Sequence, residues 1–196
     1  MVKVMDTRSA ACFDEALDLY MSAVFGGNNQ WRNACHRAAK IAAAALQEIL
    51  PDTPVRAVLV ELAAHMDDGR FLVHIGWKHD DRQIKGEFPM HLAVQIGDDL
   101  HDPGFWQLGK SSTPLRLPAT PYFFGQNWFS YARSGRGTDA EGMTWVHDGA
   151  KPGLNVGYLV REEGLPGHIT AHLMEDGEAR IHARMVRVAY GAKVST

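Results

Sequence analysis

The apolar positions near the start of the chain recur with the period of a helix. Between residues 13 and 25 they fall at spacings of three and four, which predicts an amphipathic helix. The segment Gly26-Gly27-Asn28-Asn29 predicts its end, because glycine and asparagine tolerate the left-handed conformation. The apolar positions are Phe13, Ala16, Leu17, Tyr20, Met21 and Val24.

A second helix is predicted from about Asn33 to Leu50. Asn33 is a suitable N-cap, and Pro51 follows the last apolar position of the pattern. One face of this segment carries mostly small side chains, which allow a helix to approach its neighbours closely, so we expect it to be the most buried helix. That face comprises Cys35, Ala38, Ala39, Ala42, Ala45, Leu46 and Ile49.

After Pro54 the pattern becomes that of strands. Residues 55–64 and 71–77 are rich in aliphatic and branched side chains, and the turn residues between them predict a hairpin. Residues 88–96 alternate, which places His91 on the face opposite Leu92. A turn beginning at Gly97 then leads into a short strand at residues 100–102.

The C-terminal half reads mainly as strands. They are predicted at residues 143–146, 154–160, 169–174 and 179–190, the last two forming a hairpin about Glu175-Asp176-Gly177. Helices followed by mainly antiparallel strands indicate an α+β fold. We expect one domain over residues 1–196, with a helix-plus-sheet core at 13–103 and a β-rich extension at 104–196.

The composition excludes several classes of protein. With 196 residues, 45% of them hydrophobic, the chain can bury a substantial core without disulfide bonds. A net charge of −3 with scattered basic residues does not suit a nucleic-acid binder. No apolar run has the length of a membrane span, and the first residues do not form a signal peptide. We therefore expect a soluble, cytoplasmic protein whose partners include neither nucleic acid nor membrane.

The cysteines and histidines do not predict a metal site. Cys12 and Cys35 are the two cysteines, and without an export signal they argue against a disulfide scaffold. Their spacing matches no zinc motif, and the ten histidines are dispersed. We expect no metal and no other cofactor.

Three residues in order along the chain suggest chemistry. Cys35 lies in the first turn of the alanine-rich helix, where the partial positive charge of a helix N-terminus favours a nucleophilic thiolate. His91, near the start of a strand, can exchange a proton with a thiol. Asp102, on the next strand, can hold an imidazole in one tautomer.

The segments that carry these residues resemble the core of transglutaminase-like proteins, within the broad papain-like cysteine peptidase superfamily. The resemblance covers roughly Gln30 to Pro103. It implies a fold in which a buried helix carrying the cysteine packs on an antiparallel sheet, with Cys35 as nucleophile, His91 as base and Asp102 as orienting acid. The matching segments are Cys35-His-Arg-Ala-Ala-Lys-Ile-Ala-Ala-Ala-Ala-Leu46, Val55-Arg-Ala-Val-Leu-Val60, Met90-His91-Leu-Ala-Val-Gln95 and Leu100-His-Asp102-Pro103.

The resemblance also implies an activity and further site residues. The activity is cysteine-dependent acyl transfer: hydrolysis of a peptide, isopeptide or amide bond, or transfer to an amine, on a peptide, protein or other amide-bearing substrate. Papain-type relatives place an amide side chain shortly before the cysteine, which makes Gln30 or Asn29 the candidate oxyanion donor. Trp31 is a candidate wall of a substrate groove. The chain departs from the family at His36, where a small or aromatic residue is usual, and in a short interval between His91 and Asp102.

Structural roles compete with each of these assignments. Cys35 suits a small core residue, Asp102 suits a turn before proline, and Trp31 suits a helix-end hydrophobic staple. His101 should point away from Asp102 and receives no role. The alternative function is therefore a catalytically inactive binding or scaffolding module of papain-like fold, with the aromatic stretch Tyr122 to Tyr131 as its contact surface. The oligomeric state stays open.

Overall fold

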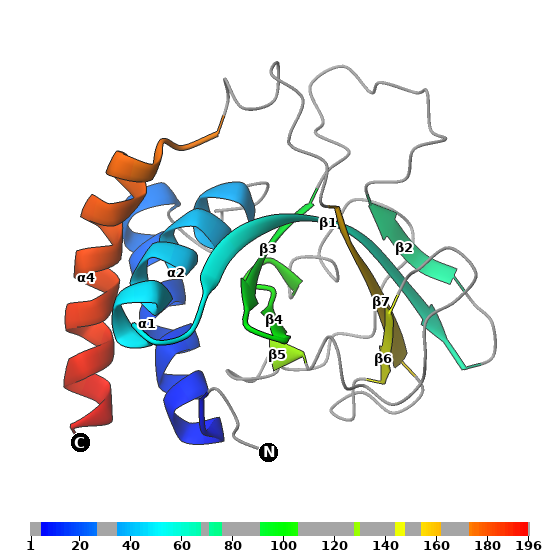
Figure 1. Cartoon of the computed structure of the whole chain (residues 1–196), viewed down its shortest axis with the longest axis horizontal. Helices are drawn as coiled ribbons and strands as arrows, with labels where there is room; N and C mark the ends of the chain where they lie inside the picture. Colours follow the sequence, from blue (N-terminus) through cyan, green and yellow to red (C-terminus); the bar gives the residue numbers. More distant parts are fainter. Residues whose placement is uncertain are drawn as a thin grey trace.

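A computed structural model of the chain describes residues 5–26, 35–67, 71–75, 91–105, 128–129, 144–147, 154–161 and 173–195. Within these ranges the chain forms three helices, which gather on one side of a curled sheet (Figure 1). No helix in the described ranges is long and apolar enough to cross a membrane.

The helices are α1 (Thr7–Phe25), α2 (Cys35–Ile49) and α4 (Asp176–Val194). Helix α1 starts before the predicted residue 13, because Asp6 caps it: the carboxylate accepts hydrogen bonds from the backbone N–H of Ser9, at 2.9 Å, and from its hydroxyl, at 2.7 Å. The bonds from Ser9 hold the pKa of Asp6 below its ordinary value. Helix α2 agrees with the predicted helix.

The strands form one antiparallel sheet in the order β5-β4-β3-β1-β7-β6, with β2 also paired to β1. Strand β1 is long enough to pair with β3 along its first half and with β2 along its second half, while β7 pairs on its other edge. The α+β class is therefore confirmed. The strands are β1 (Val55–Met66), β2 (Phe71–Ile75), β3 (His91–Ile96), β4 (Asp99–His101), β5 (Trp128–Phe129), β6 (Thr144–His147) and β7 (Leu154–Arg161).

The core lies between the helices and one face of this sheet. Strand β3 contributes Leu92, Val94 and Ile96 to it, and these pack with the alanine-rich face of α2. The predicted burial of that face is confirmed, because Ala38, Ala39, Ala42, Ala45 and Leu46 have no exposed surface. The alternate residues of β3, His91, Ala93 and Gln95, point to the other face of the sheet.

The predicted strand at residues 179–190 is wrong, and so is the hairpin about residues 175–177. Glu175 is the N-cap of α4, and the buried positions Ala179, Ala183 and Val186 follow the helical spacing of four and three. Polar and apolar residues alternate from Arg180 to Arg184, which imitates a strand. The packing of the three buried residues against α1 and α2 selects the helix over the strand.

The predicted β-rich extension at residues 104–196 is also corrected. Strand β7 pairs with the central strand β1 over eight residue pairs, and α4 packs against α1 and α2. The C-terminal part thus completes both layers, and the strands predicted near β6 and β7 are confirmed. Of the strand predicted at 169–174, residues 169–172 lie outside the described ranges, and Met174 precedes α4 without strand structure. The aromatic stretch lies outside them too, apart from β5.

Candidate active site

The hairpin of β3 and β4 sets the register of the candidate site. Ile96 pairs with Asp99, leaving Gly97 and Asp98 as a two-residue loop. Gly97 has a φ of 56°, which the turns of such tight hairpins require and glycine adopts without strain. Because Val94 pairs with His101, the next residue, Asp102, falls on the other face of the sheet.

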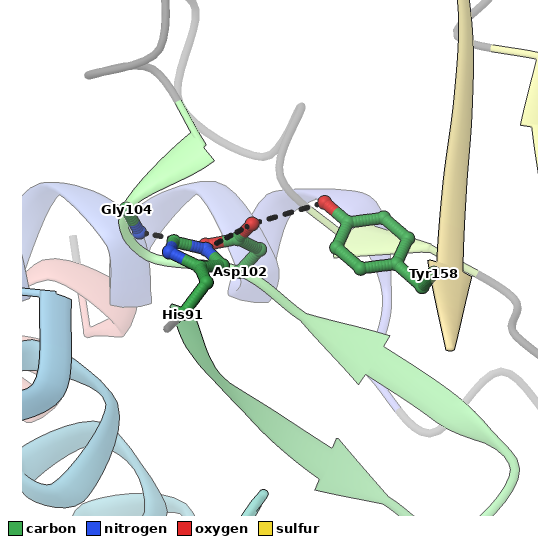
Figure 2. A network of polar contacts seen from close by, with 4 residues as sticks. All are labelled: His91, Asp102, Gly104 and Tyr158. Atoms are coloured by element: carbon green, nitrogen blue, oxygen red, sulfur yellow. Dashed lines mark hydrogen bonds and ion pairs between the residues drawn. The ribbon is translucent and has the colours of Figure 1, made fainter. Parts of the chain in front are cut away.

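His91 and Asp102 meet on that face. The His91 Nε2 atom lies 2.8 Å from Asp102 Oδ2, as the sequence predicts for an imidazole and its orienting acid. Both residues are buried, with 3% and 0% of their surface exposed. Figure 2 shows two further donors around the same carboxylate: the Gly104 backbone N–H, 2.9 Å from Oδ1, and the Tyr158 hydroxyl, 3.0 Å from Oδ2.

This set of contacts fixes the roles of the two ring nitrogens. The Gly104 N–H donates to Asp102 Oδ1 and the Tyr158 hydroxyl donates to Oδ2, so both carboxylate oxygens act as acceptors. His91 Nε2 therefore carries a hydrogen and donates it to Asp102. In the neutral ring, Nδ1 is then the basic nitrogen that can take up a proton.

Helix α2 is oriented with its start toward the start of β3. At its far end, the Gln47 side chain accepts a hydrogen bond from the backbone N–H of Val55, the first residue of β1, at 3.1 Å. Nearer its start, Lys40 lines the same cavity as Leu92. Cys35, the first residue of α2, therefore lies at the same end of the two layers as His91. The described structure includes the backbone of Cys35 but not its side chain.

Three other predicted residues lie outside the described ranges. Gln30 and Asn29, the oxyanion candidates, and Trp31, the groove candidate, fall between the described segments that end at residue 26 and begin at residue 35. Their assignments stay predictions.

His36 follows Cys35 on the first turn of α2. Burial lowers the pKa of its imidazole, and the positive charges of Arg37 and Lys40 lower it further. The ring is consequently neutral at neutral pH. His36 therefore adds no positive charge beside the start of α2.

A second buried histidine–aspartate pair lies on the helix side of the sheet. His101 Nε2 is 2.8 Å from Asp14 Oδ1, and the ring of Phe13 meets the imidazole edge-on at a centroid distance of 5.7 Å. The predicted divergence of His101 and Asp102 is confirmed. This pair joins β4 to α1.

Sequence analysis missed Tyr158, Gly104 and Asp14. Asp14 carried a signal, because a carboxylate adjacent to Phe13 on an otherwise buried helix face requires a partner. Tyr158 carried none, since its contact with Asp102 depends on how the sheet curls. The Gly104 contact depends on the turn that follows β4.

Comparison with known proteins adds information on the fold alone. No family model matches the chain, and no curated protein matches it. The fold is similar to that in the crystal structure of a genomics target protein, with a TM-score of 0.60 and 11% sequence identity, covering 97% of this chain and 81% of that one. At this identity the likeness carries no information on activity.

Proposed function

We propose that the protein is a cysteine-dependent acyl transferase or amide hydrolase of papain/transglutaminase-like fold, with Cys35 as nucleophile, His91 as base and Asp102 as orienting acid. The observation that carries the proposal is the buried contact of 2.8 Å between His91 and Asp102. In a Cys–His–Asp unit the carboxylate orients the ring through one nitrogen, and the other nitrogen acts on the thiol. The helix that begins with Cys35 starts at the same end of the fold.

The proposal requires a particular approach of the thiol. Helix α2 packs on the face of β3 that carries Leu92, whereas His91 points to the other face. For the proposed reaction, the thiol of Cys35 has to reach Nδ1 around the start of β3, where His91 is the first strand residue. A Cys35 Sγ to His91 Nδ1 distance of about 4 Å or less is expected.

The reaction follows from these positions. The thiol proton passes to His91 Nδ1, and the thiolate attacks the carbonyl carbon of an amide. As the tetrahedral intermediate collapses, the carbon–nitrogen bond breaks and Nδ1 returns its proton to the leaving amine. Water or a second amine, deprotonated by His91, then attacks the thioester and releases Cys35 as the thiol. Asp102 stabilises the imidazolium in each half of the cycle.

An activated acetyl ester tests the proposal directly. We expect p-nitrophenyl acetate to acetylate Cys35, with a burst of p-nitrophenolate, and mass spectrometry of the digested protein to locate the acetyl group. Cys35→Ser removes the burst, whereas the matched variant Cys12→Ser, on helix α1, retains it. Slow acetylation at both cysteines, or at neither, would instead favour the inactive binding module.

A further inference from the structure

Tyr158 reaches the candidate site from a distant strand of the same sheet. It lies on β7, and strands β1 and β3 separate β7 from β4, the strand that leads into Asp102. The curl of the sheet closes this distance, and Figure 2 shows the tyrosine ring pointing from β7 toward the carboxylate. The side chain has no exposed surface, and its hydroxyl lies 3.0 Å from Asp102 Oδ2.

The oxygen that Tyr158 contacts is the one that His91 contacts. Oδ2 accepts from the hydroxyl at 3.0 Å and from His91 Nε2 at 2.8 Å, while Oδ1 accepts from Gly104. Two donors on one oxygen share its negative charge. The strength with which Asp102 holds the proton of His91 therefore depends on Tyr158.

We propose that Tyr158 is a positioning residue for acyl transfer. Its hydroxyl holds the carboxylate of Asp102 in place and weakens the attraction of that carboxylate for the His91 imidazolium. This inference rests on the proposed function. A base that must return its proton to a leaving amine works best when its proton affinity is not too high. Tyr158 limits that affinity by taking part of the charge on Oδ2.

The described surroundings favour a strong effect. On the same face of the sheet, the cross-strand neighbours of His91 and Tyr158 on β1 are Val60 and Leu62, which are apolar and buried. The ionisable residues Glu61 on β1 and His101 on β4 alternate to the other face. Asp102 is fully buried, so the charge on Oδ2 interacts strongly with the two donors described, His91 and Tyr158.

The test is a Tyr158→Phe substitution, which removes one oxygen and keeps the ring. We expect it to raise the pKa of His91 by about one unit, because a hydrogen bond to a charged group is worth that order of free energy. The measurement is a titration followed by ¹⁵N NMR on histidine-labelled protein, in a Cys35→Ala background so that a thiolate does not couple to the imidazole. Tyr20→Phe is the matched control, because the Tyr20 hydroxyl bonds His182, at 2.6 Å, within the helix layer.

The outcomes separate this inference from the proposed function. A raised His91 pKa in Tyr158→Phe but not in Tyr20→Phe, with fast iodoacetamide labelling of Cys35 in the parent protein, supports both. Fast labelling with an unchanged His91 pKa would mean that Tyr158 only fills space, and it overturns this inference alone. A parent protein whose Cys35 is not labelled faster than Cys12 overturns the proposed function, and with it any positioning role of Tyr158.

Discussion

His101 and Asp102 are consecutive in the chain, yet their side chains bond to partners on opposite faces of the sheet. His101 binds Asp14 of α1 on the helix side, and Asp102 binds His91 on the other side, each at 2.8 Å. The end of β4 is consequently held from both faces. This arrangement fixes the backbone that presents Asp102 to the imidazole.

The first prediction concerns the helix-side pair. Asp14→Ala leaves His101 buried without its carboxylate partner, so the free energy of unfolding should fall by about 3 kcal/mol. Glu15→Ala is the control, since Glu15 pairs with Lys193 at the surface, and its effect should stay below about 1 kcal/mol. Denaturant unfolding followed by circular dichroism measures both. Equal losses in the two variants would show that the Asp14–His101 contact contributes little.

The second prediction tests α4 as a helix. Val186 is fully buried and Val188 is 69% exposed, although in a strand they would share one face. Val186→Ala should lower the free energy of unfolding by about 2 kcal/mol, and Val188→Ala should change it by less than about 0.5 kcal/mol. Similar losses from both substitutions would favour the strand.

The sequence was sufficient to predict elements whose signals are local. Alanines and an end at Pro51 define α2, and the short turn at Gly97 sets the β3–β4 register. That register brings Asp102 near His91, so the contact between these two residues follows from one hairpin. The prediction of a strand in place of α4 failed because polar and apolar residues alternate there over a few positions, as in a strand. Only burial against α1 and α2 selects the helical period.

Contacts between distant segments lay beyond sequence reasoning. Tyr158 meets Asp102 across two intervening strands, and the curl that allows this is a property of the whole sheet. His101 meets Asp14 through the packing of α1 on β4, which nothing in either segment encodes by itself.

The third prediction concerns pH. The pKa of His36 is lowered in the folded protein, so the unfolded chain binds more protons at this residue as the pH falls. The corresponding stability is present above the ordinary histidine pKa of 6.5 and is lost as the pH falls below it toward the lowered value. His36→Gln should therefore lose less stability than the parent between about pH 7.5 and pH 5.5 in urea unfolding. An identical pH dependence in the two proteins would contradict a lowered pKa.

The fourth prediction concerns the two partners of the proposed nucleophile. His91→Ala should slow acetylation of Cys35 by about 10²-fold or more, because it removes the base. Asp102→Asn keeps the shape of the side chain and should slow it less. Stopped-flow release of p-nitrophenolate gives both rates, and melting curves check that each variant is folded. An Asp102→Asn protein that loses more rate than His91→Ala would contradict the assigned roles.

The central claim is tested most directly by the rate at which iodoacetamide alkylates the two cysteines near neutral pH, followed by mass spectrometry. Cys12, on α1, is the internal reference. The account predicts that Cys35 reacts at least about tenfold faster than Cys12, as expected of an activated thiolate, and that His91→Ala abolishes the difference. Slow and equal labelling of both cysteines in the parent protein would contradict it.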